Sequence, residues 1–110
     1  MKVMHLEAHS IEGISGVAMA LLLDEARIER IRVDVAQIDA GASMPRHQAG
    51  QRQLFYVVSG AGRVAAEDNS EVPVGPGSMV EWQEGEWHTS WADSAMTVLI
   101  IQSRAACGNP

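Results

Sequence analysis

The sequence predicts an all-β protein built as a single domain. A chain of 110 residues has the length of one domain and can bury one core without disulfide bonds. From about residue 50 onward, turn-forming residues recur every six to twelve positions, which is the spacing of short strands joined by tight turns. No segment there keeps an apolar period of 3.6 residues over a dozen positions. Together these observations favour a β-sandwich or β-barrel.

The clearest strand signal of the first half runs from Ile28 to Ile38. Isoleucine and valine occupy odd positions there (31, 33 and 35), whereas Arg32 and Asp34 occupy the even positions between them. A period of two residues predicts a half-buried strand. The interleaved acidic and basic side chains of residues 24–34 are interpreted as a solvated mixed face.

Two other segments of the first half are less regular. Residues 17–23 are apolar and too few for a typical helix, so we expect a strand, with a helical turn as the alternative. Residues 39–41 and the pair Met44–Pro45 predict a turn-rich connection, because Pro45 lacks a backbone donor and restricts the residue before it.

The second half predicts a series of short strands. Each is a run of β-branched, aromatic or aliphatic residues that ends at glycine, proline, asparagine or aspartate. The expected strands are residues 54–58, 63–66, 71–74, 79–82, 87–91 and 96–102. The barrel core should therefore span about residues 28–103, with a short N-terminal segment before it and a frayed tail from Arg104 to Pro110.

Composition excludes several classes of function. The net charge is −6 and no run of Lys or Arg occurs, so we expect no nucleic-acid partner. No apolar stretch approaches the roughly 18 residues of a membrane span, and the N-terminus does not resemble a secretory signal. Cys107 is the single cysteine, so no disulfide can form within the chain. The expected location is the cytoplasm.

The most informative residues are His47 and His88. They lie 41 positions apart, each next to a glycine-punctuated strand. In a small β-barrel, histidines on two such strands can meet inside the barrel. His5 and His9 lie outside these segments and are interpreted as surface or packing residues.

The spacing around both histidines resembles that of the cupin superfamily. The first cupin motif, G-x5-H-x-H-x3-E-x6-G, matches here at Gly41, His47 and Gly60. The second motif, G-x5-P-x-G-x2-H-x3-N, matches at Gly77, Gly85 and His88. The resemblance covers residues 41–92 and implies a double-stranded β-helix, or jelly-roll barrel, with a site inside it.

The departures from these motifs concern metal binding. Cupins with an intact site hold a divalent metal through three histidines and one glutamate, but Ala49 and Gln53 replace one of each here. Losing the carboxylate costs on the order of 4 kcal/mol of attraction at an effective dielectric constant near 20. The remaining candidate ligands His47, Gln53 and His88, with Glu86 as a further possibility, predict Zn, Fe, Ni or Mn held weakly, or no metal.

Without a metal, the two imidazoles could act as catalytic acid and base near neutral pH. Gln53 would then orient a substrate through its amide. Strand parity places Phe55 beside Gln53 as a pocket residue. We also expect Trp82 at the pocket and Trp91 on the outer or dimer face.

The sequence is compatible with three functions. The first is a small-molecule enzyme of the isomerase, cyclase, lyase or oxygenase type that uses His47, Gln53 and His88. The second is a non-catalytic module that binds a small ligand, and the third is a structural or regulatory partner. A homodimer formed through open sheet edges is expected in each case.

Overall fold

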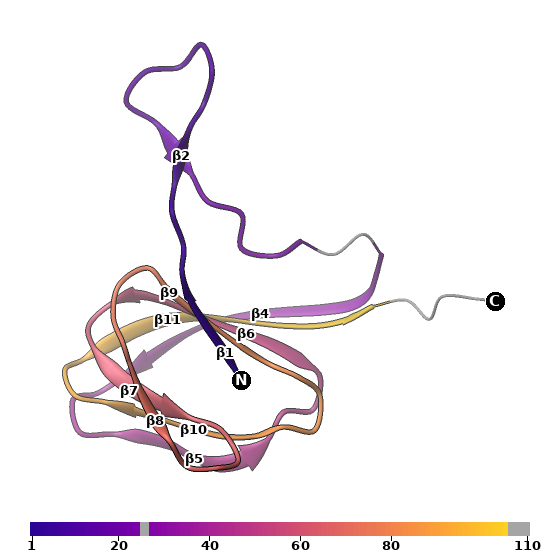
Figure 1. Cartoon of the computed structure of the whole chain (residues 1–110), viewed down its shortest axis with the longest axis vertical. Coiled ribbons are helices and arrows are strands. Elements are labelled where there is room, and N and C mark those ends of the chain that lie inside the picture. The colour runs from indigo at the N-terminus through magenta and orange to yellow at the C-terminus, as the bar shows by residue number, and fades with distance from the viewer. Residues whose placement is uncertain (25–26, 106–110) are drawn as a thin grey trace.

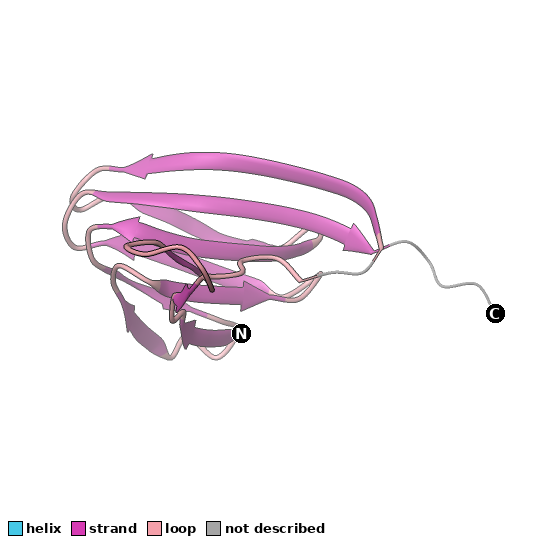
Figure 2. Cartoon of the chain, turned by 90° about the horizontal axis from the view of Figure 1, so that it is seen from above, coloured by secondary structure: helices cyan, strands magenta, loops and turns pink. Residues whose placement is uncertain are grey.

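The structure is a computed structural model that describes residues 1–24 and 27–105. Within these ranges the chain forms eleven strands and no helix (Figure 2). The prediction of an all-β chain is therefore confirmed. Cys107 and most of the expected tail lie outside the described residues, whereas Arg104 belongs to the last strand.

Two antiparallel sheets face each other and form the barrel (Figure 1). The large sheet has the order β1-β9-β6-β11-β4, and the small sheet has the order β5-β10-β7-β8. The strands of the large sheet are β1 (Lys2–His5), β9 (Ser78–Trp82), β6 (Arg52–Ser59), β11 (Met96–Ala105) and β4 (Ile28–Ile38). Those of the small sheet are β5 (Ser43–Gln48), β10 (Trp87–Ala92), β7 (Gly62–Ala65) and β8 (Glu71–Val74).

The main core lies between the two sheets. Because side chains alternate across a strand, every second residue of the central strands points inward. The large sheet contributes Phe55 and Val57, and the small sheet contributes Val64, all nearly or fully buried. Burial of such side chains stabilises the fold by about 1.5–3 kcal/mol each.

A smaller apolar cluster lies on the outer face of the large sheet. Leu54, Met79 and Ile101 form its buried centre. The N-terminal segment covers it with the partly buried side chains of Met4, Leu6, Leu22 and Leu23. This segment also supplies β1, which pairs with β9, so the barrel sheet extends beyond the core expected from the sequence.

The segment between β1 and β4 projects from the barrel as an arm, defined here as residues 7–21. Its only paired residues are β2 (His9–Ser10) and β3 (Ala18–Met19), which form a short hairpin (Figure 1). The strand expected over residues 17–23 is thus limited to two residues.

The connection expected around Met44–Pro45 is instead the strand β5. This strand is an edge of the small sheet, and its pairing with β10 shifts between His47 and Met44. An edge position and a β-bulge are the places where a sheet tolerates proline, because no ladder hydrogen bond is lost there. The bulge explains how Pro45 fits in a strand.

Candidate functional site

His47 and His88 meet in the small sheet. They are directly opposite each other across β5 and β10, and their ring centroids are 4.1 Å apart with a tilt of 57°. The structure therefore brings together the two rings that the sequence singled out. Their surroundings differ, because His88 is 2% exposed whereas His47 is an exposed residue. The two rings meet as expected, but only His88 lies inside the barrel, whereas His47 lies at its open mouth.

Local hydrogen bonds orient both rings in the same way. Nδ1 of His47 lies 2.6 Å from the carbonyl oxygen of Pro45, and Nδ1 of His88 lies 3.3 Å from that of Glu86. A carbonyl only accepts, so Nδ1 is the donor in each ring. In a neutral ring with this tautomer, Nε2 carries the lone pair. Both histidines thus offer Nε2 as an acceptor or base.

The interior side of His88 holds two polar atoms without a protein partner. Among the described side chains, Nε2 of His88 and Nε1 of Trp82 are buried and form no hydrogen bond. The two rings stack at 4.2 Å with an angle of 24°. A buried polar atom without a partner costs about 1–3 kcal/mol. These two atoms, one acceptor and one donor, are therefore suited to bind a small polar molecule.

Burial also sets the protonation of His88. Desolvation lowers the pKa of His88 below its usual value of 6.5, and the nearby His47 lowers it further. The hydrogen bond to the Glu86 carbonyl acts in the opposite direction but does not reverse the shift. His88 is therefore a neutral imidazole at neutral pH, the form that can accept a proton.

Acidification is expected to destabilise the protein through His88. The unfolded chain takes up this proton near pH 6.5, whereas the folded chain does so only at lower pH. The free energy of unfolding should be at its full value above pH 6.5 and should fall as the pH drops from there toward the pKa of His88 in the folded chain. Urea denaturation at about pH 7.5 and about pH 5.5 measures this loss. His88→Gln should reduce this loss of unfolding free energy, whereas His9→Gln, on the arm, should leave the loss unchanged. Equal losses in both variants would contradict the assignment of the pH dependence to His88.

A cavity of about 420 Å³ opens at the mouth of the barrel beside His47. It is lined mainly by polar side chains from β4, β5, β6 and β11. The lining residues are Arg32, Asp34, Met44, His47, Gln48, Gly50, Gln53, Ile100 and Gln102.

The floor of this cavity is a row of side chains that crosses the large sheet. The strand register places Arg32 beside Gln102, Gln102 beside Gln53, and Gln53 beside Trp82. Arg32 also pairs with Asp34, with Nε 2.8 Å from the carboxylate. The row therefore runs from the guanidinium of Arg32 at the rim to the buried indole of Trp82, which stacks on His88.

The sequence interpretation missed Arg32, Asp34 and Gln102. The alternation in β4 was correct, but its two faces were assigned the wrong way round. Val33 and Val35, expected on the buried side, are 57% and 63% exposed, whereas Arg32 and Asp34 line the cavity. Alternation alone separates two faces without saying which one meets the core.

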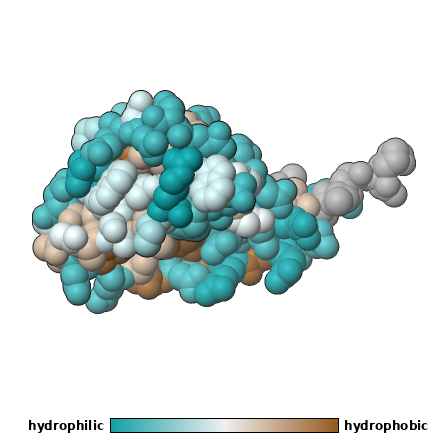
Figure 3. Space-filling model, turned by 90° about the horizontal axis from the view of Figure 1, so that it is seen from below, coloured by the Kyte–Doolittle hydropathy of each residue, from teal (hydrophilic) through white to brown (hydrophobic). Residues whose placement is uncertain are grey.

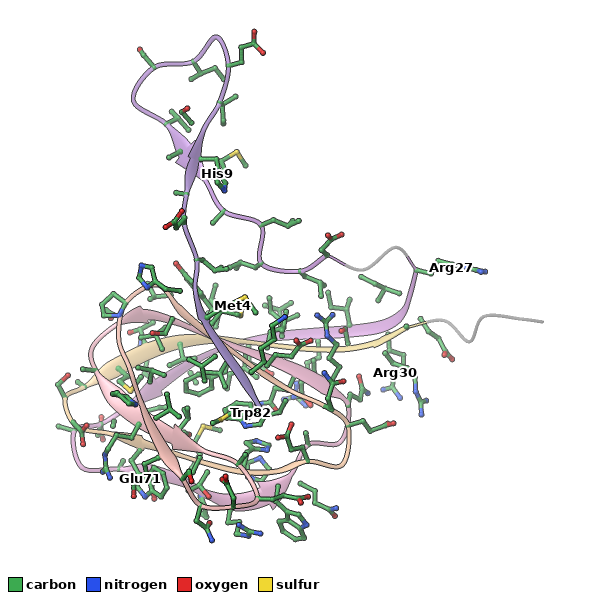
Figure 4. The ribbon with its side chains drawn as sticks, viewed as in Figure 1. Met4, His9, Arg27, Arg30, Glu71 and Trp82 are labelled. Atoms are coloured by element: carbon green, nitrogen blue, oxygen red, sulfur yellow. The ribbon has the colours of Figure 1, made fainter. Side chains whose placement is uncertain are left out.

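Two residues expected to line the pocket pack deeper. Phe55 is 1% exposed and meets the edge of the Trp82 ring at 5.6 Å, while Trp82 is fully buried (Figure 4). Neither of them lines the cavity, and His88, which stacks on Trp82, does not line it either. Trp91 points outward and carries the guanidinium of Arg63 at 5.1 Å from its ring centroid, as the parity of its strand predicted.

The carboxylate of Glu86 makes its hydrogen bonds away from the histidines, although its charge opposes the lowering of the His88 pKa. That carboxylate binds the N-terminal ammonium of Met1 and accepts a hydrogen bond from the backbone N–H of Gln83. The sequence offered no sign of this contact, because it joins residues 85 positions apart.

A larger hollow of about 800 Å³ lies between the N-terminus and the loops that follow β7 and β9. Its side chains include Glu67, Asp68 and Glu84 but no histidine. The smaller cavity at the mouth is lined by His47 and Gln53, two of the residues that the sequence singled out, so it is the better candidate site.

The comparison with known families identifies the fold. The model of the cupin domain matches residues 34–102, which is more than half of the chain. The chain belongs to the cupin family. This membership agrees with the two facing antiparallel sheets and confirms the resemblance found in the sequence.

Solved structures share this architecture at low sequence identity. A cupin superfamily protein from Desulfitobacterium hafniense superposes with a TM-score of 0.64 at 13% identity, over 84% of this cupin and 83% of that chain. A conserved protein of unknown function from Streptococcus pyogenes gives 0.64 at 19%, over 70% and 67%.

A salicylate 1,2-dioxygenase variant from Pseudoaminobacter salicylatoxidans, in complex with gentisate, is also similar to this cupin. Its TM-score is 0.60 at 19% identity, over 66% of this cupin but only 20% of that longer chain. No curated protein matches the sequence. No helix that could cross a bilayer occurs in the part of the chain that the structure describes.

Cupins often bind metals, but the donors of this cupin do not fit a tightly held divalent ion. His47 and His88 offer two neutral nitrogen atoms, and Gln53 adds a neutral amide. Ala49, at the place of the second motif histidine, is 3% exposed and packs in the core. Over residues 1–24 and 27–105, no three His, Cys, Asp or Glu side chains gather as a metal-binding group. The carboxylates of Asp34 and Glu86 pair with Arg32 and with the N-terminal ammonium of Met1, so they do not supply the pair with a free anionic ligand for a dication.

Proposed function

We propose that this cupin binds a small polar metabolite at the mouth of its barrel and acts on it by proton transfer. An isomerisation, a cyclisation or a lyase step would use such chemistry. The observation that carries the proposal is the buried, unpartnered Nε2 of His88. The His88 ring lies beside His47, which lines the cavity, and stacks on Trp82 at the inner end of the row of polar side chains.

His88 is the proposed base in this scheme. Its lowered pKa keeps the ring neutral, and its Nδ1–H is directed to the Glu86 carbonyl, so Nε2 carries the lone pair. Because Nε2 is buried and His88 does not line the cavity, the substrate has to enter beyond His47 to reach this atom. His47 has solvent access and the same tautomer, so it is the proposed partner that returns a proton from the solvent side.

Gln53 and Arg32 are the proposed orienting groups. Gln53 is 5% exposed and reaches the cavity from the centre of the large sheet. An amide both donates and accepts hydrogen bonds, so it suits a hydroxyl or carbonyl. Arg32 at the rim suits a carboxylate, which guanidinium groups bind with paired hydrogen bonds.

A non-catalytic module that captures a small ligand is the second candidate. The row of Arg32, Gln102 and Gln53 favours it, because those groups can hold a polar molecule without any proton transfer. For either function, the homodimer and the cytoplasmic location expected from the sequence remain part of the proposal.

Incubating the protein with small carboxylic and hydroxy acids in ²H₂O tests both functions in one experiment. Ligand-detected NMR reports which compound binds, with gentisate included, and deuterium incorporation reports proton transfer. We expect at least one compound to bind and exchange, and His88→Gln to slow the exchange by about 100-fold or more, which is the usual range for a general base. His9→Gln is the matched control.

The outcomes separate the two functions. Binding without exchange in the unchanged protein would favour the binding module. Exchange that persists in His88→Gln at the unchanged rate would contradict the role of the imidazole pair.

A further inference from the structure

The inner faces of β4 and β11 carry three arginines at the outer end of the cavity. Side chains alternate along a strand, so Arg30 shares with Arg32 the face of β4 that lines the cavity. Arg104 lies two residues beyond the lining residue Gln102 and therefore shares the inner face of β11. Figure 4 shows Arg30 on the side of the large sheet that faces the small sheet. These three arginines belong to only eight Lys and Arg residues in a chain of net charge −6.

The strand register places two of the arginines directly opposite each other. Arg30 is the partner of Arg104, just as Arg32 is the partner of Gln102. The Cβ atoms of directly opposite residues are about 5 Å apart, and like charges in such a pair destabilise a sheet. An anion bound between the two guanidinium groups would remove this repulsion.

Acidic side chains do not neutralise this arginine pair. Arg32 is bound to Asp34, with Nε 2.8 Å from the carboxylate. Neither Arg30 nor Arg104 forms an ion pair within the part of the chain that the structure describes. Because a guanidinium group stays protonated in proteins, the pair carries two positive charges without a counterion from the chain.

The arginines of the small sheet, in contrast, have partners of their own. The outer face of that sheet is largely hydrophilic (Figure 3). Arg63 binds Glu71 and Asp93 at 2.6 and 3.2 Å. Arg46 donates a hydrogen bond to the side-chain oxygen of Asn69 at 2.9 Å. The lack of a partner is therefore a property of the pair on β4 and β11 and not of exposed arginines in general.

A small hollow of about 150 Å³ adjoins the arginine pair. Its lining residues are Arg30, Ile31, Arg32, Gln51 and Gln102. All of them except the isoleucine carry side-chain N–H donors, which suit the oxygen atoms of an anion. Gln51 also lines the neighbouring hollow together with Arg104, so donors lie on both sides of it.

We propose that Arg30 and Arg104 bind a phosphate group, and that the metabolite of the proposed function is a small phosphate monoester. Such a group carries about −1.5 to −2 charges at pH 7, which matches two unpaired guanidinium groups, whereas one carboxylate would match only one of them. By the strand spacing, the backbone of Arg104 lies about 8 Å from that of Gln53, so a small ester can extend from the arginine pair to this amide. The identity of the metabolite rests on the proposed function, but the phosphate subsite can be tested without it.

An NMR titration with glycerol 3-phosphate tests the subsite. We expect the unchanged protein to bind this probe and the Nε–H signals of Arg30 and Arg104 to shift. Arg30→Gln and Arg104→Gln should each weaken binding at least about 10-fold, because each removes charge-assisted hydrogen bonds. Arg30→Lys keeps the charge but loses the paired hydrogen bonds, so its affinity should lie between those of the unchanged protein and Arg30→Gln.

Arg46→Gln is the matched control, because Arg46 is an exposed arginine of the small sheet. It should leave the dissociation constant unchanged. Both Arg30 and Arg104 are exposed, and removing one of two like charges relieves repulsion, so the urea midpoint should not fall in either variant. Succinate is the matched ligand, because it carries two separate carboxylates, and it should bind more weakly than glycerol 3-phosphate.

Three results would overturn the subsite. The first is an unchanged protein that does not bind glycerol 3-phosphate at millimolar concentration. The second is binding that Arg30→Gln and Arg104→Gln weaken no more than Arg46→Gln does. The third is equal affinity for succinate, because the pair would then not select phosphate.

Failure of the subsite can be told apart from failure of the proposed proton transfer. His88→Gln should slow deuterium exchange but bind glycerol 3-phosphate like the unchanged protein, because the arginine pair lies at the other end of the cavity. Phosphate binding that depends on Arg30 and Arg104 would support the subsite even if no compound exchanges. Exchange of a substrate whose KM is the same in Arg30→Gln and Arg104→Gln would support the proton transfer and overturn the subsite.

Discussion

Gly60→Ala is expected to lower the free energy of unfolding by about 3 kcal/mol or more. Gly60 lies in the turn between β6 and β7 with φ of +84°, a conformation that costs an alanine roughly 1–2 kcal/mol. A Cβ at this position would also lie 2.1 Å from the backbone oxygen of Ala95 and 2.8 Å from the Cα of Met96. Those neighbours are backbone atoms, so relief requires β11 to move, and overpacking of this kind costs a further 1–3 kcal/mol or so.

Urea denaturation measures this loss, and Gly75→Ala is the matched control. Gly75 also lies in a turn, but a Cβ there would meet no atom within 4 Å and no positive φ is required. Its stability should stay within about 0.5 kcal/mol of the unchanged protein. A similar loss in both variants would contradict the steric explanation and would indicate a general sensitivity of turns to substitution.

Much of the fold could be predicted because its constraints are local. Gly60 and Gly85 have positive φ, and the runs of β-branched and aromatic residues between the turns became strands with nearly the expected bounds. β4 was also expected with its observed ends, Ile28 and Ile38.

The wrong predictions of the fold concern features that the local sequence pattern does not determine. Val33 was assigned to the buried side of β4, yet it is exposed, because the interior at the barrel mouth is polar and the apolar face lies outside. Pro45 suggested a turn, and only the edge position of β5 and its bulge make a strand possible there. The pairing of β1 with β9 joins residues far apart in the sequence, so composition gave no sign of it.

The candidate site shows the same division. Spacing alone led to His47 and His88, because glycine turns and strand parity fix where those residues lie in the barrel. It did not lead to Arg32, whose role at the mouth depends on the face of β4 that turns inward. The depth of Trp82 and the contact between Glu86 and Met1 depend on packing between distant segments, which the sequence does not encode locally.

Restoring the two missing motif ligands is expected to turn this cupin into a metal-binding protein. Purified without chelator, the unchanged protein should retain less than about 0.1 equivalent of any divalent transition metal, because two imidazoles and an amide lack anionic charge. Gln53→Glu supplies a carboxylate, whose attraction to a dication is on the order of 4 kcal/mol at an effective dielectric constant near 20. That energy corresponds to about a thousandfold in affinity.

The double variant Ala49→His with Gln53→Glu adds the third imidazole and should bind Zn²⁺ near one equivalent, as measured by metal analysis and calorimetry. Ala49 is 3% exposed, so the larger ring requires local repacking and the melting temperature must be checked. If this variant does not fold, Gln53→Glu alone still tests the effect of charge.

The role of His88 follows from the same experiment. His88→Ala in the background of the double variant should remove most of the gained affinity, because Nε2 of His88 is available as a ligand. His9→Ala should remove none of it. Gained affinity that survives His88→Ala would mean that the introduced side chains bind metal elsewhere, and the two imidazoles would then not share one site. If the affinity is lost with His88, the metal binds beside the two imidazole rings of the small sheet. A polar ligand of this cupin would then be expected at the same place.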